Sequence, residues 1–417
     1  MSPALRLGTF DAERSWRPAD LARLPAAPSA TSHVEVMDEL LAGLCAPGDT
    51  LVTRRAVDPE LLAGWEEAGL RFAHRTVEGA VGSVEELFAR DPAAPALLRD
   101  NHLAPYAVTD AVAALAGTSP TRLPDPRDTA LVNSKTWSND VVLDLGLPGA
   151  GVVVRSTADL ARAVADAGPV AVVKDPYGVS GSGALEVGSP GVLRAITRVL
   201  DRQVAAGARV ELVVQRRFDK RHDLSAHGEL APDGSWHWLG TRLVHNQGFR
   251  YAGSSPADGS LARFEPALRD AAAEVARRAF AEGYHGPLSV DAMVLADGTL
   301  VPVLEVNARV SLGRLALRLD RVLGAGALRC HLWQVESAVP PGTSVGRLLG
   351  ALRRAGLHLD GTGAGCVVLG GGVVAAPTAR LHCALLCAPE DLAELRTRVL
   401  ASFADSGLRP RGAVHAT

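Results

Sequence analysis

The first part of the chain alternates helical and strand-like hydrophobic patterns. Between residues 34 and 117, DELLAGLC and DPELLAGWEEAGL have apolar residues at helical spacing, and TLVTR is typical of a strand. DAVAALAGT predicts a last helix that ends at Gly117. These alternating patterns predict a small α/β unit with a parallel sheet. The stretch SPTRLPDPRD, residues 119–128, carries three prolines and predicts a linker.

The middle of the chain changes from helices to successive strands. Helices are predicted at 135–145 and in DLARAVADAG, and two apolar runs then flank a Gly/Ser-rich turn in GPVAVVKDPYGVSGSGALEVGS. Between residues 207 and 246, RVELVVQRRF, LSAHGEL and SWHWLGTRLVHN predict strands. The helix ALRDAAAEVARRAFAEG precedes the hairpin LSVDAMVLADGTLVPVLEVNAR. The remainder predicts a helix in SVGRLLGALRRAG, two strands and a helix at 390–403, as a small C-terminal α+β segment.

Polar residues alternate along the second strand of that hairpin. In VPVLEVNAR, side chains two apart share a face, so Glu305, Asn307 and Arg309 lie together. On the partner strand Asp291 interrupts an apolar run in the same way. A two-residue Asp-Gly turn would place Asp291 on the core face, whereas an odd-length loop with Gly298 in the left-handed conformation places it beside Glu305. We predict the odd-length loop.

Two carboxylates and an amide oxygen on rigid strands suit a hard cation such as Mg²⁺. Asp291, Glu305 and Asn307 supply these groups, and Arg309 could reach an anion held by the metal. A solvated sheet face, or an Arg-Glu ion pair, is the alternative explanation of the same pattern.

The turn between residues 170 and 187 is rich in glycine and serine. Gly178, Gly181 and Gly183 alternate with Ser180 and Ser182, and such a turn leaves backbone N–H groups free to surround a phosphate. Lys174 ends the preceding strand and could reach phosphate oxygens. No G-K-[ST] motif occurs, and a strand rather than a helix follows, which excludes a Walker A loop. A plain hairpin turn is the alternative.

The composition of the chain argues against several classes of function. The chain has 417 residues, with 43 basic and 46 acidic side chains, so no global field favours nucleic acid or an anionic membrane. No leader or spanning segment is recognisable, and we expect a cytoplasmic protein. The five cysteines form no C-x-x-C pair and the twelve histidines show no zinc spacing, so free thiols are expected.

Taken in order, five motifs resemble those of the ATP-grasp superfamily of ligases. They are NSK at 133–135, VVKDPYGVSGSG at 172–183, VVQRRF at 213–218, SVDAMVLADG at 289–298 and LEVNAR at 304–309. The resemblance implies an α/β (α+β) fold: an N-terminal α/β pre-ATP-grasp domain (1–125), an ATP-grasp core with two α+β subdomains holding ATP between antiparallel sheets (126–330, lid about 138–212), and a C-terminal α+β segment (331–417).

The resemblance also implies roles for individual residues. Lys135 and Lys174 would contact ATP phosphates, with the loop of Gly178, Ser180, Gly181, Ser182 and Gly183 closing over them. Gln215, Arg216 and Phe218 match the adenine hinge, and Asp223 matches the ribose contact, although the spacing also permits His222. Asp291, Glu305 and Asn307 match the ligands of two Mg²⁺ ions, and Arg309 matches the arginine that steadies the transferred phosphate.

The chain departs from the pattern at two positions. The usual acidic hinge residue is Gln215 here, and Ser289 stands where some relatives carry an arginine. Arg242, on the TRLVHN strand, is the candidate for the missing catalytic charge, with an ordinary surface arginine as the alternative.

The resemblance implies an ATP-dependent ligase that joins a small carboxylate to an amine, such as an amino acid or short peptide, through an acyl-phosphate. ADP and phosphate would be released, and specialised metabolism is the expected setting. Arg309, Ser311 and Arg314 would contact substrate. The polar loop at 245–255 is either a further substrate contact or an ordinary solvent loop. Three alternatives stay open: a bicarbonate-using carboxylase, a small-molecule kinase and a non-catalytic ATP-binding module. The oligomeric state is open too, a homodimer being one alternative.

Overall fold

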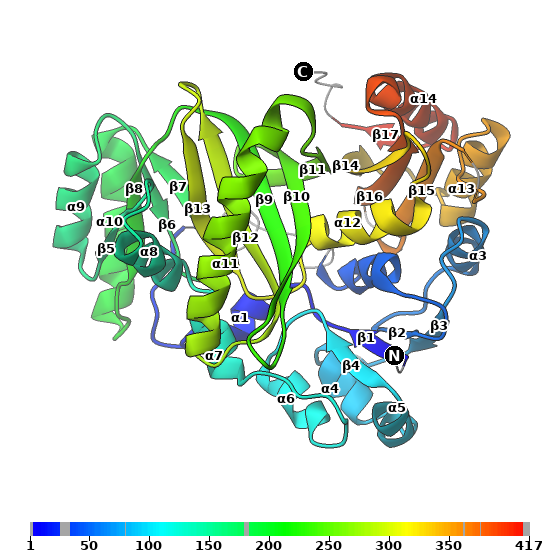
Figure 1. Cartoon of the computed structure of the whole chain (residues 1–417), viewed down its shortest axis with the longest axis horizontal. Helices are drawn as coiled ribbons and strands as arrows, with labels where there is room; N and C mark the ends of the chain where they lie inside the picture. The colour runs from blue at the N-terminus through cyan, green and yellow to red at the C-terminus, as the bar shows by residue number, and fades with distance from the viewer. Residues whose placement is uncertain are drawn as a thin grey trace.

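Three sheets organise the part of the chain that the structure describes, and Figure 1 shows how they are arranged. The computed structural model describes residues 3–25, 34–79, 81–178, 183–361, 363–375 and 377–411.

The N-terminal unit is a parallel sheet with strand order β3-β2-β1-β4, which confirms the predicted parallel sheet. The alternating pattern recognised in the sequence begins at residue 34, and β1 and α1 precede it. DELLAGLC forms a 3-10 helix instead of an α-helix. The elements are β1 (Ala4–Leu7), α1 (Ala12–Trp16), η1 (Met37–Leu44), β2 (Thr50–Thr53), α3 (Pro59–Glu67), β3 (Ala73–Thr76), α4 (Val84–Ala89), α5 (Ala94–Asp100), β4 (His102–Pro105) and α6 (Asp110–Ala116).

The second sheet is antiparallel and has the order β5-β8-β6-β7. Apolar residues of its two helices pack on it and form a separate small core. We call this unit the lid. Its elements are β5 (Val152–Val154), α9 (Thr157–Asp166), β6 (Ala171–Lys174), β7 (Ala184–Val187), α10 (Pro190–Ala205) and β8 (Leu212–Arg216). Helices α7 (Pro126–Val132) and α8 (Lys135–Asp144) precede it.

In the described ranges the largest sheet has nine strands. Eight of them follow the order β13-β12-β9-β10-β11-β14-β16-β15, and β17 pairs with β14. Residues 245–255, expected to be a loop, instead form the end of β10, a tight turn and β11, because the two strands remain paired through this stretch. The strands are β9 (Lys220–Leu230), β10 (Trp236–Gln247), β11 (Arg250–Pro256), β12 (Gly286–Leu295), β13 (Leu300–Asn307), β14 (Arg329–Ala338), β15 (Gly365–Gly370), β16 (Thr378–Cys387) and β17 (Arg409–Pro410).

The C-terminal strands share a core with the N-terminal unit. Apolar residues of η1, α3, α13 and β14 to β16 form one buried cluster, and the indole of Trp65 donates a hydrogen bond to Val368 O (2.9 Å). The remaining elements are η2 (Gly259–Phe264), α11 (Glu265–Ala281), α12 (Leu312–Leu323), α13 (Val345–Arg354), η3 (Gly372–Ala375), η4 (Pro389–Asp391) and α14 (Leu392–Asp405).

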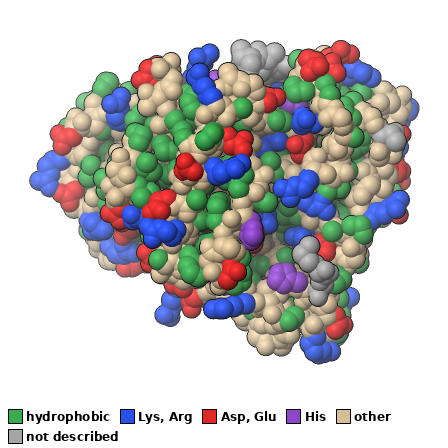
Figure 2. Space-filling model, viewed as in Figure 1, with side chains coloured by type: hydrophobic (Ala, Val, Ile, Leu, Met, Phe, Trp, Pro, Cys, Tyr) green, Lys and Arg blue, Asp and Glu red, His purple; other side chains and the backbone are tan. Residues whose placement is uncertain are grey.

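The surface mixes charges of both signs, as the small net charge of −3 implies. Figure 2 shows Lys and Arg interspersed with Asp and Glu over the visible face. The five cysteines are buried free thiols. Among the described residues, no helix combines the length and apolar character needed to cross a membrane.

Candidate active site

The NSK segment joins α7 to α8 and holds the outer edge of strand β13. Ser134 caps the start of α8. Asn133 Oδ1 accepts a hydrogen bond from Ala308 N (3.0 Å), and Ser138 Oγ accepts one from Val306 N (3.0 Å). Because β13 is at the edge of its sheet, these side chains take the place of a neighbouring strand. The start of α8 is thereby fixed beside the polar face of β13.

Lys135, the first residue of α8, connects β13 to the glycine loop. Its Nζ lies 2.9 Å from Glu305 Oε1 and donates to Gly178 O at 2.7 Å. Lys174 ends β6 nearby, and burial lowers its pKa, with Lys135 adding to the effect and Glu305 opposing it. Burial also acts to raise the pKa of Glu305, but the two lysines outweigh it and the net shift is downward. Lys135 and Lys174, which are predicted to contact phosphate, therefore both interact with the ionised carboxylate of Glu305.

The hairpin has the register that the sequence predicted. Asp291 pairs directly with Glu305, and Gly298 has a φ of +87° in an odd-length loop closed by Leu295 N and Thr299 O (2.8 Å). An irregularity follows: Met293 pairs with Val301, so Ala292 alone stands opposite residues 302–304. The two carboxylates consequently face each other across the strands.

The paired carboxylates form the set expected to bind Mg²⁺. Asp291 accepts hydrogen bonds from Ser225 Oγ (2.8 Å) and Asn307 Nδ2 (3.2 Å). Burial and the charge of Glu305 raise the pKa of Asp291 to about 6. A cation between the carboxylates would relieve this repulsion, and with the amide oxygen they offer the hard donors that Mg²⁺ prefers, so the residues fit the metal. No three His, Cys, Asp or Glu side chains of the described residues are grouped for a metal.

Arg309 lies at the end of the same face. Its Nε donates to Glu13 Oε1 (2.5 Å) and its Nη2 to Asn307 Oδ1 (3.1 Å). The guanidinium also lies over the ring of Tyr106, 5.6 Å from its centroid. Burial acts to lower the pKa of Arg309, but Glu13, Tyr106 and Glu305 together outweigh it and the net shift is upward. Its Nη1 also donates to Val310 O (3.3 Å), so the charged arginine is held by four groups.

Arg242 belongs to the same cross-strand row as the carboxylates. Glu305, Asp291, Ser225 and Arg242 pair in sequence across β13, β12, β9 and β10, so their side chains share one face. The guanidinium turns away toward Cys330 O and is almost fully buried, and its Nε has no hydrogen-bond partner among the described residues. Burial lowers the pKa of Arg242. It is not a surface arginine.

Ser311 and Arg314, predicted to contact substrate, anchor helix α12 to the sheet in this structure. Ser311 Oγ lies 3.0 Å from His227 Nδ1, and a Cβ on Gly313 would meet the same ring at 2.2 Å. Arg314 pairs with Glu229 at 2.5 Å. Their predicted role stays a prediction.

The predicted nucleotide residues lie at the junction of the lid and the large sheet. Gln215 and Arg216 end β8, and the Gln215 amide donates to Gly149 O. Arg216 lies 5.3 Å from the centroid of the Phe218 ring. Asp223, on β9, accepts from Lys220 Nζ at 2.5 Å and from Asn246 Nδ2 at 2.8 Å.

The two ends of the glycine loop, at Gly178 and Gly183, lie very close together. A Cβ on Gly178 would lie 2.2 Å from the Cα of Gly183, so neither position has room for a side chain. The predicted contacts Ser180, Gly181 and Ser182 lie outside the described residues.

Sequence reasoning missed three charged residues that support this site. Glu13 pairs with Arg309, and Arg17 pairs with Asp175, the residue after Lys174. Asp175 could have been noticed in the VVKDP motif. Nothing in the local pattern singled out Glu13 or Arg17, because their partners are distant in sequence.

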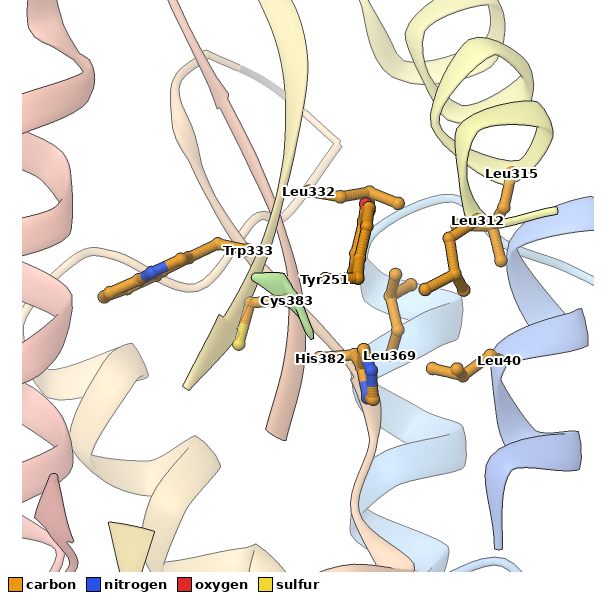
Figure 3. A pocket seen from close by; sticks show the side chains of 9 residues that line it. All are labelled: Leu40, Tyr251, Leu312, Leu315, Leu332, Trp333, Leu369, His382 and Cys383. Atoms are coloured by element: carbon orange, nitrogen blue, oxygen red, sulfur yellow. The ribbon is translucent and has the colours of Figure 1, made fainter. Parts of the chain in front are cut away.

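A small pocket lies between η1, α12 and strands β11, β14, β15 and β16 of the large sheet. Figure 3 shows Tyr251 at its centre, with Leu40 of η1 and Leu312 and Leu315 of α12 on one side. Its volume is about 10 Å³, which is enough for roughly one water molecule. It is too small for an amino acid.

Comparison with known proteins supports the fold. No protein-family model and no curated protein sequence matches the chain. The biotin carboxylase of Campylobacter jejuni, solved with a nucleotide, matches with a TM-score of 0.62 and 11% identity over 99% of this chain and 92% of that one. The N5-carboxyaminoimidazole ribonucleotide synthetase of Thermus thermophilus matches with a TM-score of 0.56 and 16% identity over 95% and 98%.

A third structure agrees. The N5-carboxyaminoimidazole synthetase of Staphylococcus aureus, complexed with ADP, matches with a TM-score of 0.57 and 10% identity over 96% of this chain and 97% of that one. Each match extends over almost the whole of both chains. The predicted fold is confirmed: this chain has the ATP-grasp fold.

Proposed function

We propose that this protein is an ATP-dependent ligase that joins a small carboxylate to an amine. One observation carries the proposal: three cationic side chains lie around two facing carboxylates. The cations are Lys135, Lys174 and Arg309, and the carboxylates are those of Asp291 and Glu305. Three cations beside two acidic groups suit a polyanion bound through a divalent metal. The proposal gains support from the ADP complex among the structural neighbours.

The first step is transfer of the γ-phosphoryl group of ATP to a substrate carboxylate oxygen. The bond from phosphorus to the β,γ-bridging oxygen breaks, which gives an acyl-phosphate and ADP. Lys135 and Lys174 hold phosphate oxygens, and Arg309, fixed by Glu13 and Asn307, stabilises the charge that moves with the phosphoryl group. Mg²⁺ held by Asp291, Glu305 and Asn307 would neutralise further phosphate charge.

The second step is attack of the amine nitrogen on the acyl carbon. The bond from the acyl carbon to the phosphate oxygen breaks, phosphate leaves, and the proton of the amine goes to the departing phosphate. Phosphorylation is needed because an unmodified carboxylate has a poor leaving group. The products are an amide, ADP and phosphate.

The nucleotide base belongs at the hinge between the lid and the large sheet. We assign adenine to the end of β8 at Gln215 and Arg216, beside Phe218, and the ribose to Asp223. The support is their position, because these residues join the sheet that carries Lys174 to the sheet that carries the carboxylates.

A carboxylase is the second candidate. It is favoured by the structural neighbours, which include a biotin carboxylase and two carboxyaminoimidazole synthetases. In that case bicarbonate takes the place of the carboxylate, and the same residues would stabilise carboxyphosphate.

One incubation separates the candidates. The protein is mixed with ATP, Mg²⁺ and pooled amino acids, with or without ¹³C-bicarbonate, and nucleotides and product masses are measured. ADP with a product lighter by one water than its summed substrates supports the ligase. A ¹³C-labelled product supports the carboxylase, and a phosphorylated product without condensation indicates a kinase. AMP contradicts the acyl-phosphate route.

Glu305→Gln tests the site itself. It keeps the shape of the side chain but removes the charge that pairs with Lys135. Turnover is expected to fall by about 10²–10³-fold, the usual loss when one electrostatic contact to the reacting groups is removed. Glu186→Gln is the matched control, because Glu186 pairs with Arg217 on the exposed surface of the lid. A Glu305→Gln variant as active as the control contradicts the assignment.

A further inference from the structure

Helix α1 is fixed to the N-terminal sheet at the centre of the molecule, where Figure 1 places it between the three sheets. The indole of Trp16 donates to Val108 O (2.9 Å), and Phe10, just before the helix, stacks on Tyr106 with the ring centroids 4.0 Å apart. Both contacts hold the helix in place, so Glu13 in the helix and Arg17 directly after it start from a fixed position.

Glu13 reaches the large sheet. Its side chain is 2% exposed and binds Arg309 Nε at 2.5 Å. Arg309 is also held by Asn307 Oδ1 through Nη2, by Val310 O through Nη1 (3.3 Å) and by the ring of Tyr106. Glu13 is the carboxylate among these partners, and its ion pair fixes the Nε edge of the guanidinium.

Arg17 reaches the lid in the opposite direction. Its Nη1 and Nη2 bind the two carboxylate oxygens of Asp175 at 2.5 and 2.8 Å, and the two side chains are 7% and 6% exposed. A bidentate pair of this kind fixes orientation as well as distance.

Asp175 lies at the base of the glycine loop. It follows Lys174 directly, its Oδ1 accepts from Tyr177 N (2.9 Å), and its own N–H donates to Gly183 O (2.7 Å). Both ends of the loop are thus joined at the residue that Arg17 holds.

The chain after Arg17 also binds the lid. Ala22 N donates to Arg209 O (2.9 Å), and Gln203 exchanges two hydrogen bonds with the backbone of Arg23. Ala22 and Leu24 are buried in the core of the lid. We call residues 18–25 the strap, because they tie the lid to the N-terminal unit.

We infer that Arg17 and Glu13 are positioning residues of the ATP site. Arg17 sets the place of Lys174 and the glycine loop through Asp175, and Glu13 sets the direction of Arg309. The inference rests on the proposed function, since it assumes that these groups hold ATP phosphates. One short helix then fixes the groups on both sides of the phosphoryl group that is transferred.

The test for Arg17 compares ligands with and without phosphates. Arg17→Met keeps most of the side-chain length but removes the charge. Binding of Mg-ATP and Mg-ADP is expected to weaken at least 10-fold, and binding of adenosine less than 2-fold, by calorimetry. Arg17→Lys should restore part of the loss. Arg23→Met is the matched control, because the Arg23 side chain is exposed and the contacts with Gln203 use only the backbone of Arg23.

The test for Glu13 separates kcat from binding. Glu13→Gln keeps the side-chain shape, and kcat is expected to fall at least 10-fold with the Kd for ATP changed less than 2-fold, because Arg309 acts on the transferred group. Asp175→Asn serves as the second variant if Arg17→Met does not fold.

Distinct results overturn the two ideas. Equal loss for ATP and adenosine, or no loss in folded Arg17→Met or Asp175→Asn, refutes the role of Arg17. Unchanged kcat in Glu13→Gln refutes the role of Glu13. A wild-type protein that binds no ATP refutes the proposed function, and the inference falls with it.

Discussion

Replacing Ser138 by alanine removes the hydrogen bond that this side chain accepts at the edge of strand β13. The Ser138 hydroxyl is fully buried, donates to Ser134 O (3.0 Å) and accepts from Val306 N (3.0 Å). In the variant the N–H of Val306 has no partner and no route to water. Leaving a buried donor unpaired costs about 1–3 kcal/mol, and we expect the free energy of unfolding to fall by that amount.

The loss should also reach the active site. Glu305 and Asn307 flank Val306, so a β13 edge without its partner holds both groups less firmly, and we expect turnover to fall together with stability. Urea unfolding followed by tryptophan fluorescence measures the first effect and the ATP assay measures the second. Ser235→Ala is the control, because its hydroxyl and the Asp233 partner are exposed. A change below about 0.5 kcal/mol, the range of ordinary surface substitutions, would refute the reasoning.

Two further predictions concern the glycine loop and a buried histidine. Gly183→Ala places a Cβ 2.1 Å from Gly178 Cα, so ATP binding measured by calorimetry should be lost. The control Gly117→Ala adds a Cβ with ordinary contacts and should bind ATP normally. Normal binding by Gly183→Ala would contradict the loop geometry. Burial, with Arg242 and Arg396, lowers the pKa of His331 from 6.5 to about 3. The unfolded chain therefore binds a proton that the folded chain does not, and stability falls as the pH drops below 6.5. By linkage, the wild type should lose about 2 kcal/mol more than His331→Gln between pH 6.5 and pH 5; parallel unfolding curves for the two proteins would contradict it.

The sequence was most informative where the pattern is local. The alternation in VPVLEVNAR and the loop length at Gly298 were enough to predict that Asp291 faces Glu305, which the register confirms. Strand β1 was missed because four residues, Ala4–Leu7, carry too little periodicity to stand out.

The supporting contacts could not be predicted for a different reason. Glu13 and Arg309 are 296 residues apart, and Arg17 and Asp175 are 158 apart. Periodicity shows which face of an element is buried but does not show which distant element covers it. Similarly, the predicted substrate residue Ser311 can be recognised as a helix cap, but its contact with His227 depends on how α12 packs on the sheet.

The continuity of the large sheet has a consequence for how the chain folds during synthesis. Strand β11 ends at Pro256 and pairs with β14, which begins only at Arg329. At roughly 5–20 residues per second, the edge of β11 stays open for several seconds while residues 257–328 are made. An open strand edge can pair with another nascent chain. A fragment that stops before β14 keeps that edge open permanently. Truncation of the C-terminal part therefore shortens the sheet and also leaves a strand edge at which chains can aggregate.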